Sequence, residues 1–302
     1  MKNKHPQTPS AAAAVSRALL GLPIVIAVVV IAAGLWAYWP TAVALFKEWQ
    51  TNDDYSVGQL VPLVALYLVW RERQSLKTCQ VAPCWWGLGL ILFALAVNTT
   101  AFLFMYESGQ RYALVLTIVG LVLTIAGGQV FRRLLWVMLF LFLMVPLPGR
   151  IHNAISGPLQ AWATSGAVFL LELSGITVGR EGNTILLNHS IPLAVAEACS
   201  GLRMLTAFVV VAATMVYVVK RPPWQKAVLL ASCIPVAIAC NLARLWTTAM
   251  LYLLVDSKTA EWFFHDAAGL AMMPLAVVIM AGELWLMKKL VIADDPPQTQ
   301  HR

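Results

Sequence analysis

The sequence predicts an all-α membrane protein, a polytopic transmembrane bundle of about eight spans with one extra helical element that is interfacial or re-entrant. Two observations support this prediction. Of the 302 residues, 60% are hydrophobic and only 12% are charged, whereas a soluble domain carries about 25% charged residues. The hydrophobic residues are also gathered into separate runs, most of them long enough to cross a bilayer as a helix.

Eight apolar runs account for the expected membrane spans. A helix needs about 20 residues to cross the hydrocarbon core, so the second and fifth runs must borrow flanking residues. A further stretch at residues 155–176 is apolar but interrupted by polar residues, and we expect it to stay on the outer side without crossing. The eight runs are residues 19–39, 57–70, 85–105, 112–128, 133–147, 201–219, 227–255 and 267–287.

The positions of Lys and Arg predict the orientation of these helices. Most basic residues collect on one side when eight spans are counted, which favours that side as cytoplasmic. Treating residues 155–176 as a ninth span would break this alternation for the rest of the chain. We therefore expect both termini to be cytoplasmic. The expected organisation is a tail at residues 1–18, a transmembrane domain at residues 19–290 and a tail at residues 291–302.

Composition and motifs argue against several function classes. The net charge of +7 does not indicate nucleic-acid binding, because the basic residues come in twos and threes between apolar runs. Cys79 and Cys84 form a C-x4-C pair, but no second pair or nearby histidine completes a zinc site. Metalloprotease H-E-x-x-H and phosphate-binding glycine motifs are lacking. We therefore expect no nucleic-acid partner, no metal and no cofactor, and membrane lipid as the surroundings.

The segment EACSGLR, residues 197–203, precedes the sixth apolar run and carries the first unusual chemistry. Cys199 falls at the expected outer N-terminus of a helix, where free N–H groups and the helix dipole stabilise a thiolate. Arg203 follows one turn later and can add positive charge on the same face. The alternative is a small residue that caps the helix and an arginine that reaches the lipid headgroups.

A second unusual segment, NLAR at residues 241–244, lies inside the seventh apolar run. An arginine in a membrane helix costs about 2.5–3.5 kcal/mol on insertion scales, so it normally faces a partner or a wet cavity. Because this span runs outward, Arg244 is expected toward the outer leaflet, with Asn241 on the same face to orient the guanidinium. The alternative is again an arginine that contacts headgroups.

The third segment is HDAAG, residues 265–269, at the outer start of the eighth run. His265 can titrate near neutral pH and Asp266 could modulate it, although a lone interfacial histidine is also a common headgroup contact. The predicted topology puts Cys199, Arg244 and His265 on one side of the membrane at similar depth. A thiol, a cation and an imidazole are the groups that acyl transfer through a thioester requires.

These segments together resemble the exosortase/archaeosortase family of polytopic cysteine transpeptidases. Such proteins often carry a histidine after Tyr-Ser in the early loop, where this chain has Val57, and this departure weakens any role for that loop. The resemblance spans about residues 49–289 and rests on EACSGLR, NLAR and HDAAG in that order, with DDYSVGQLVP at residues 53–62 and PLP at residues 146–148.

The resemblance implies an enzyme of the bacterial cytoplasmic membrane that recognises C-terminal sorting signals on exported proteins. Such a signal contains a short motif, often Pro-Glu-Pro, followed by an apolar helix and a basic tail. The enzyme cuts near the motif and passes the protein to an acceptor nucleophile of unknown identity, typically during export linked to exopolysaccharide. By this resemblance Cys199 is the nucleophile, Arg244 a proton donor or electrostatic stabiliser, and His265 a transition-state or acid–base residue. A guanidinium hardly deprotonates, so we favour His265 as the proton carrier.

Two other function classes stay open at this point. A small transporter or flippase could use Arg244 to bind an anionic substrate, although such proteins often contain inverted repeats, and this sequence has none. A structural subunit of an envelope-polysaccharide export machine would need no catalysis at all. An outward-facing, reactive Cys199 distinguishes the enzyme from both.

Overall fold

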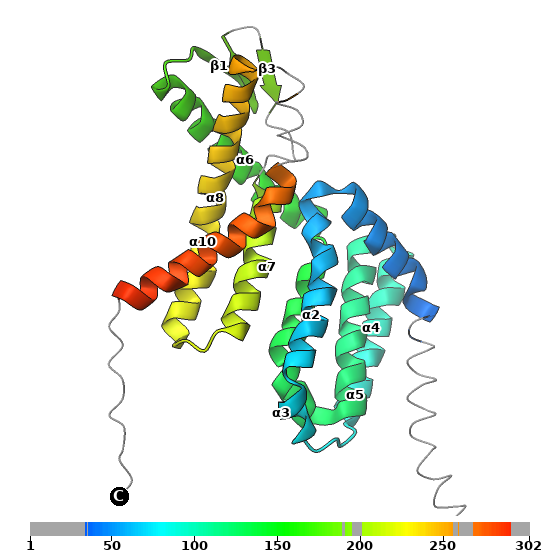
Figure 1. Cartoon of the computed structure of the whole chain (residues 1–302). Helices are drawn as coiled ribbons and strands as arrows, with labels where there is room; N and C mark the ends of the chain where they lie inside the picture. Colours follow the sequence, from blue (N-terminus) through cyan, green and yellow to red (C-terminus); the bar gives the residue numbers. More distant parts are fainter. Residues whose placement is uncertain are drawn as a thin grey trace, which may run out of the picture. The chain divides into compact units, whose positions relative to one another are not determined.

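The computed structural model describes residues 34, 36–188, 191–194, 201–255, 259 and 268–290. Most of these residues are helical (Figure 1). They divide into two compact units, one formed by Met1–Phe46 and Glu72–Leu135 and the other by Lys47–Arg71 and Trp136–Arg302.

The first unit is built from helices packed through small residues. Gly87 of α4 lies directly against Gly120 and Thr124 of α5, with no room for a β-carbon between the two helices. Small residues allow membrane helices to approach this closely, which is why they favour such contacts. The unit contains helical residues 36–46, α3 (Arg73–Lys77), α4 (Trp85–Leu103) and most of α5 (Glu107–Leu141).

The long helix α5 is interrupted at Gly127, whose φ of 83° and ψ of 176° are not helical. The interruption falls at the end of the fourth apolar run, close to where the sequence analysis separated that run from the fifth. Gly127 is also so close to the carbonyl of Ala82 that a side chain could not fit. Both the left-handed φ and the close approach therefore require glycine at this position.

The second unit combines helices with a small sheet. The three strands form an antiparallel sheet in the order β1-β2-β3, with Val178 opposite Leu187 and Thr184 opposite Ala194. The sequence analysis expected only helices and did not anticipate this sheet. Its elements are η1 (Asp53–Gln59), α2 (Leu60–Arg71), η2 (Phe142–Met144), α6 (Gly149–Leu173), β1 (Val178–Glu181), β2 (Thr184–Leu187), β3 (Ile191–Ala194), α7 (Leu202–Val218), α8 (Pro223–Leu254) and α10 (Ala268–Leu290).

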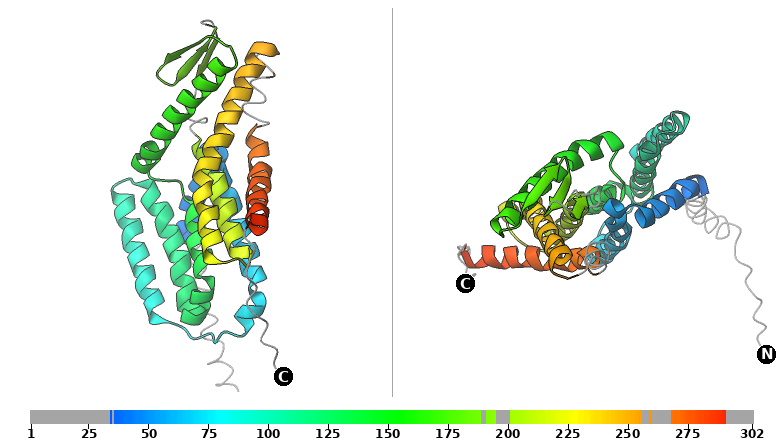
Figure 2. Two further views of the ribbon diagram at one scale, coloured as in Figure 1. Left: turned by 90° about the vertical axis from the view of Figure 1, so that its left-hand side faces the viewer. Right: turned by 90° about the horizontal axis from the view of Figure 1, so that it is seen from above.

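Two hydrophobic clusters organise the second unit, and α8 takes part in both (Figures 1 and 2). The bundle cluster joins α7, the first part of α8 and α10, and consists of Met204, Phe208, Val211, Ala212, Val216, Leu229, Cys233, Ala237, Ala276 and Met280. The sheet cluster joins α6, the sheet and the last part of α8, and consists of Ala163, Ala167, Leu171, Ile185, Leu187, Leu193, Leu245 and Ala249.

The length of α8 explains this double role. Its 32 residues extend over about 48 Å at 1.5 Å per residue, which is more than the roughly 30 Å of a hydrocarbon core. The first part of α8 therefore packs in the helical bundle, and the part after Arg244 packs against α6 and the sheet. The sequence analysis expected this last part to continue a membrane span.

Three described helical stretches are long and apolar enough to cross a membrane, namely Trp85–Leu103, Glu107–Met144 and Pro223–Leu254, and Leu202–Val218 is a shorter apolar helix. These helices support a helical membrane protein, whereas the number of about eight spans stays a prediction. The first expected span, residues 19–39, lies mostly outside the described residues. The extra element at 155–176 falls largely within α6, which is not among these three stretches.

Candidate functional site

The structure describes three of the six residues that the sequence analysis selected. Arg203 lies in the first turn of α7, and Asn241 and Arg244 lie in α8. The proposed nucleophile Cys199, and His265 with its neighbour Asp266, lie outside the described residues. The described part of the site therefore consists of the helices that adjoin these residues in the sequence and the elements that pack against those helices.

Asn241 connects α8 to the beginning of α7. Its side chain is buried, with 1% of its surface exposed. A β-carbon added to Gly201, the residue that caps α7, would lie 3.3 Å from the Asn241 side-chain nitrogen. The NLAR segment thus packs directly against the end of the EACSGLR segment. The structure brings together two segments that the sequence analysis had selected separately.

Arg244 lies one turn after Asn241 and is also buried, with 7% of its surface exposed. In the sequence of α8 it follows Ala237 of the bundle cluster and precedes Leu245 and Ala249 of the sheet cluster. A buried guanidinium at the junction of two apolar clusters is costly unless polar groups surround it. This burial argues against the alternative that Arg244 simply extends to lipid headgroups.

Arg203 has a partner that the sequence analysis did not predict. Its Nη1 atom lies 3.3 Å from Oδ2 of Asp53, the first residue of η1, and the Arg203 side chain is 17% exposed. The guanidinium therefore shares its charge with a carboxylate. This ion pair also joins η1 to the first turn of α7. Arg203 follows Cys199 by four residues in the sequence.

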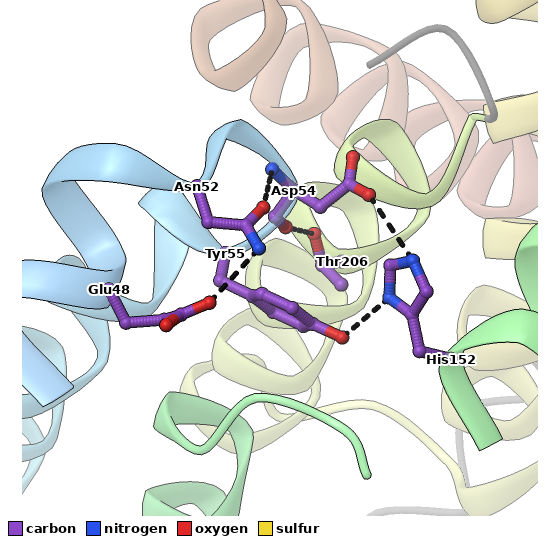
Figure 3. Close-up of polar contacts among 6 residues, drawn as sticks. All are labelled: Glu48, Asn52, Asp54, Tyr55, His152 and Thr206. Carbon is purple, nitrogen blue, oxygen red and sulfur yellow. Dashed lines mark hydrogen bonds and ion pairs between the residues drawn. The ribbon is translucent and has the colours of Figure 1, made fainter. Parts of the chain in front are cut away.

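A polar cluster of buried Asp54, buried Tyr55 and half-buried His152 lies next to this contact (Figure 3). The Tyr55 hydroxyl and Nδ1 of His152 are 2.7 Å apart. On the other side of the ring, Nε2 of His152 lies 3.8 Å from Oδ2 of Asp54, whose side chain is 6% exposed. The imidazole from α6 thus lies between a hydroxyl and a carboxylate that both come from η1.

Further hydrogen bonds fix the backbone of η1 (Figure 3). The Asn52 side-chain oxygen accepts a hydrogen bond of 3.1 Å from the Asp54 amide, which caps the start of η1. The Asn52 side-chain nitrogen donates to Glu48 over 3.0 Å. The Thr206 hydroxyl of α7 lies 3.3 Å from the Asp54 carbonyl oxygen. A cavity of about 20 Å³ between η1, η2 and α7 is lined by Asp54 and Thr206, among others.

The sequence analysis gave little weight to the early loop because Val57 replaces the histidine that similar proteins often carry. In the structure Val57 is buried and lines the small cavity, and the imidazole beside the loop comes from α6 instead. Nothing in the sequence around His152, GRIHNAISG, indicates a functional residue. The sequence signal for this polar cluster was the pair of carboxylates at Asp53 and Asp54, because a buried carboxylate needs a polar or charged partner.

The chain was compared with known proteins and families. A family model described as transmembrane exosortase matches residues 49–282. The matched region extends from just before η1 into α10 and contains η1, α6, α7 and α8 of the site described above. No curated protein and no solved structure matches the chain.

Proposed function

This chain belongs to the transmembrane exosortase family, and from that premise we propose that it is a cysteine protease and transpeptidase embedded in the bacterial inner membrane. Its substrates would be exported proteins whose C-terminal sorting signal consists of a short motif, an apolar helix and a basic tail. The catalytic residues would be Cys199, Arg244 and His265, with Arg203, Asn241 and Asp266 in supporting positions. The acceptor nucleophile is a second, separate partner.

One structural observation supports this proposal in addition to the family membership. Buried Asn241 packs against Gly201, two residues after Cys199, and buried Arg244 follows one turn later on α8. Because Arg244 follows Asn241 by one turn of α8, we propose that its guanidinium serves a Cys199 thiolate at the N-terminus of α7. A transporter that used Arg244 to bind an anion would not need a cysteine at this point.

The proposed reaction has two steps. The Cys199 thiolate attacks the scissile carbonyl carbon, and the resulting oxyanion is stabilised by the Arg244 guanidinium. The His265 imidazolium donates its proton to the leaving amine, the C–N bond breaks, and an acyl-thioester remains on Cys199. In the second step the acceptor nucleophile gives its proton to His265 and attacks the thioester carbonyl. The C–S bond then breaks and releases the Cys199 thiolate.

We also propose that both termini are cytoplasmic and that the active site faces the periplasm, in a transmembrane domain at residues 19–290 between two short tails. Two contacts within the second unit join residues that are expected on the same side of the membrane. The Trp49 indole donates a 2.9 Å hydrogen bond to the Met144 carbonyl, and both residues are expected on the outer side. Nη2 of Arg71 donates a 2.9 Å hydrogen bond to the Val218 carbonyl, and both are expected on the cytoplasmic side.

The test replaces Cys199 by alanine and follows a reporter protein that ends in a sorting signal of this type. We expect the variant to accumulate in the membrane as the wild type does but to leave the reporter uncleaved. Cys199→Ser should retain at most a trace, because a hydroxyl is far less ionised than a thiol. The matched control is Cys84→Ala, which removes a half-buried free thiol in the first unit and should process normally. Normal reporter maturation by Cys199→Ala would refute the cysteine mechanism.

A further inference from the structure

We infer that His152 is a positioning residue for this reaction. Its imidazole, at the start of α6, contacts η1. In turn, η1 contacts the first turn of α7. In the sequence, this turn directly follows the segment that contains Cys199. The inference rests on the proposed function only in taking Cys199 as the nucleophile. No motif that led to that function includes His152.

Both ring nitrogens of His152 are directed at the same short 3-10 helix. Tyr55 meets Nδ1 at 2.7 Å, and Asp54 faces Nε2 at 3.8 Å. The Tyr55 and His152 rings are also in contact, with centroids 5.7 Å apart. A single side chain of α6 therefore contacts two consecutive residues of η1.

The same short helix is attached to α7 on its other side. Asp53 pairs with Arg203 at 3.3 Å, and the backbone carbonyl of Asp54 lies 3.3 Å from the Thr206 hydroxyl. Neighbouring carboxylates of η1 thus point to different helices, Asp53 to α7 and Asp54 to α6. A displacement of η1 from His152 would be passed on to the first turn of α7.

The experiment measures Cys199 directly, without any substrate. Intact cells that express the protein are treated with a membrane-impermeant maleimide, and modification of the Cys199 peptide is followed by mass spectrometry. The variants are His152→Gln, Asp54→Asn, the double variant and Tyr55→Phe. The matched control is Glu172→Gln, which removes an exposed carboxylate from the same helix α6. Processing of the sorting-signal reporter is measured in parallel.

We expect His152→Gln and Asp54→Asn each to lower the labelling rate of Cys199 and the processing rate by about tenfold, with no further loss in the double variant, because the two residues act as a pair. Tyr55→Phe should lower both rates by less, since it removes one hydroxyl and keeps the packing of the ring. Glu172→Gln should behave as the wild type. Labelling at the wild-type rate in His152→Gln, or effects that simply add in the double variant, would overturn the inference.

Membrane abundance separates positioning from a merely structural role. We expect His152→Gln to accumulate in the membrane as the wild type does while the labelling rate of Cys199 falls. A loss of membrane abundance that accounts for the whole loss of labelling would refute the positioning role. Labelling that responds as expected while no variant, nor the wild type, processes the reporter would refute the proposed function instead and leave the positioning intact.

Discussion

Asn241 of α8 lies against Gly201 at the start of α7, so close that a β-carbon on Gly201 would be 3.3 Å from the Asn241 side-chain nitrogen. Gly201 also has a φ of 81°, a left-handed conformation that side chains rarely adopt. Backbone conformation and close approach therefore both require glycine here. The contact fixes the distance between α8 and Gly201, the residue that caps α7 and follows Cys199 by two positions in the sequence.

Replacing Gly201 by alanine should separate these two segments. The left-handed conformation costs about 1–2 kcal/mol for a residue with a β-carbon, and the new methyl group must also displace Asn241. We expect reporter processing to fall by more than about tenfold. The matched control is Gly175→Ala, which has a φ of 79° but open space around the added methyl group. Equal processing by the two variants would mean that only backbone strain matters at Gly201.

A second glycine prediction concerns the stability of the first unit. Gly127→Ala would place a side chain on a residue with a φ of 83°, and the new β-carbon would clash with the Ala82 carbonyl. This carbonyl could move only if the loop before α4 moved with it. We expect much less folded protein in detergent extracts, measured by size-exclusion chromatography. The neighbouring Gly128 has nothing within 4 Å of an added β-carbon. Gly128→Ala should therefore be close to neutral, and an equal loss in both variants would contradict this explanation.

The apolar runs in the sequence predicted several helices to within a few residues. The runs 85–105 and 201–219 became α4 (Trp85–Leu103) and α7 (Leu202–Val218), because a long apolar segment without breakers has few alternatives to a helix. The seventh run is also helical, and Pro223–Leu254 is long and apolar enough to cross a membrane, but the packing partners at its end were not predicted. Apolar residues such as Leu245 and Ala249 face α6 and the sheet, and composition cannot distinguish a protein-facing surface from a lipid-facing one.

The polar contacts of the site were the hardest features to predict. Arg244 and Asn241 were found because polar residues stand out in an apolar helix. The pair of Asp54 and His152 joins residues 98 positions apart in the sequence, and no periodicity relates them. The sheet was missed because its strands have only four residues each, too few to display a clear alternation.

The proposed orientation in the membrane can be tested with reporter fusions. Fusions after Arg150 and after Arg180 should both report the periplasm, because α6 lies between them and is expected not to cross. Fusions within residues 71–77 and 220–226 should report the cytoplasm. Opposite signals from the first two sites would mean that α6 crosses the membrane, and Cys199 would then be on the wrong side for the proposed reaction.

The last prediction concerns Arg244, where two explanations give different results. An arginine that only reaches headgroups can be replaced by lysine with little effect. An arginine that holds an oxyanion loses its planar, multi-donor geometry when it becomes lysine. Because Arg244 is buried, with 7% exposure, we expect the second result. Loss of one oxyanion donor costs about 10²–10³ in rate in characterised enzymes, so Arg244→Lys should reduce processing by a similar factor.

Arg244→Ala should be equally inactive, while removal of a charge from the helix should not hinder membrane insertion. Membrane abundance measured beside processed reporter therefore separates catalysis from folding. Arg150→Lys is the matched control, because Arg150 is exposed at the start of α6 and the same exchange there should have no effect. If Arg244→Lys processes the reporter nearly as fast as the wild type, Arg244 does not stabilise the oxyanion, and the reaction would depend on Cys199 and His265 alone.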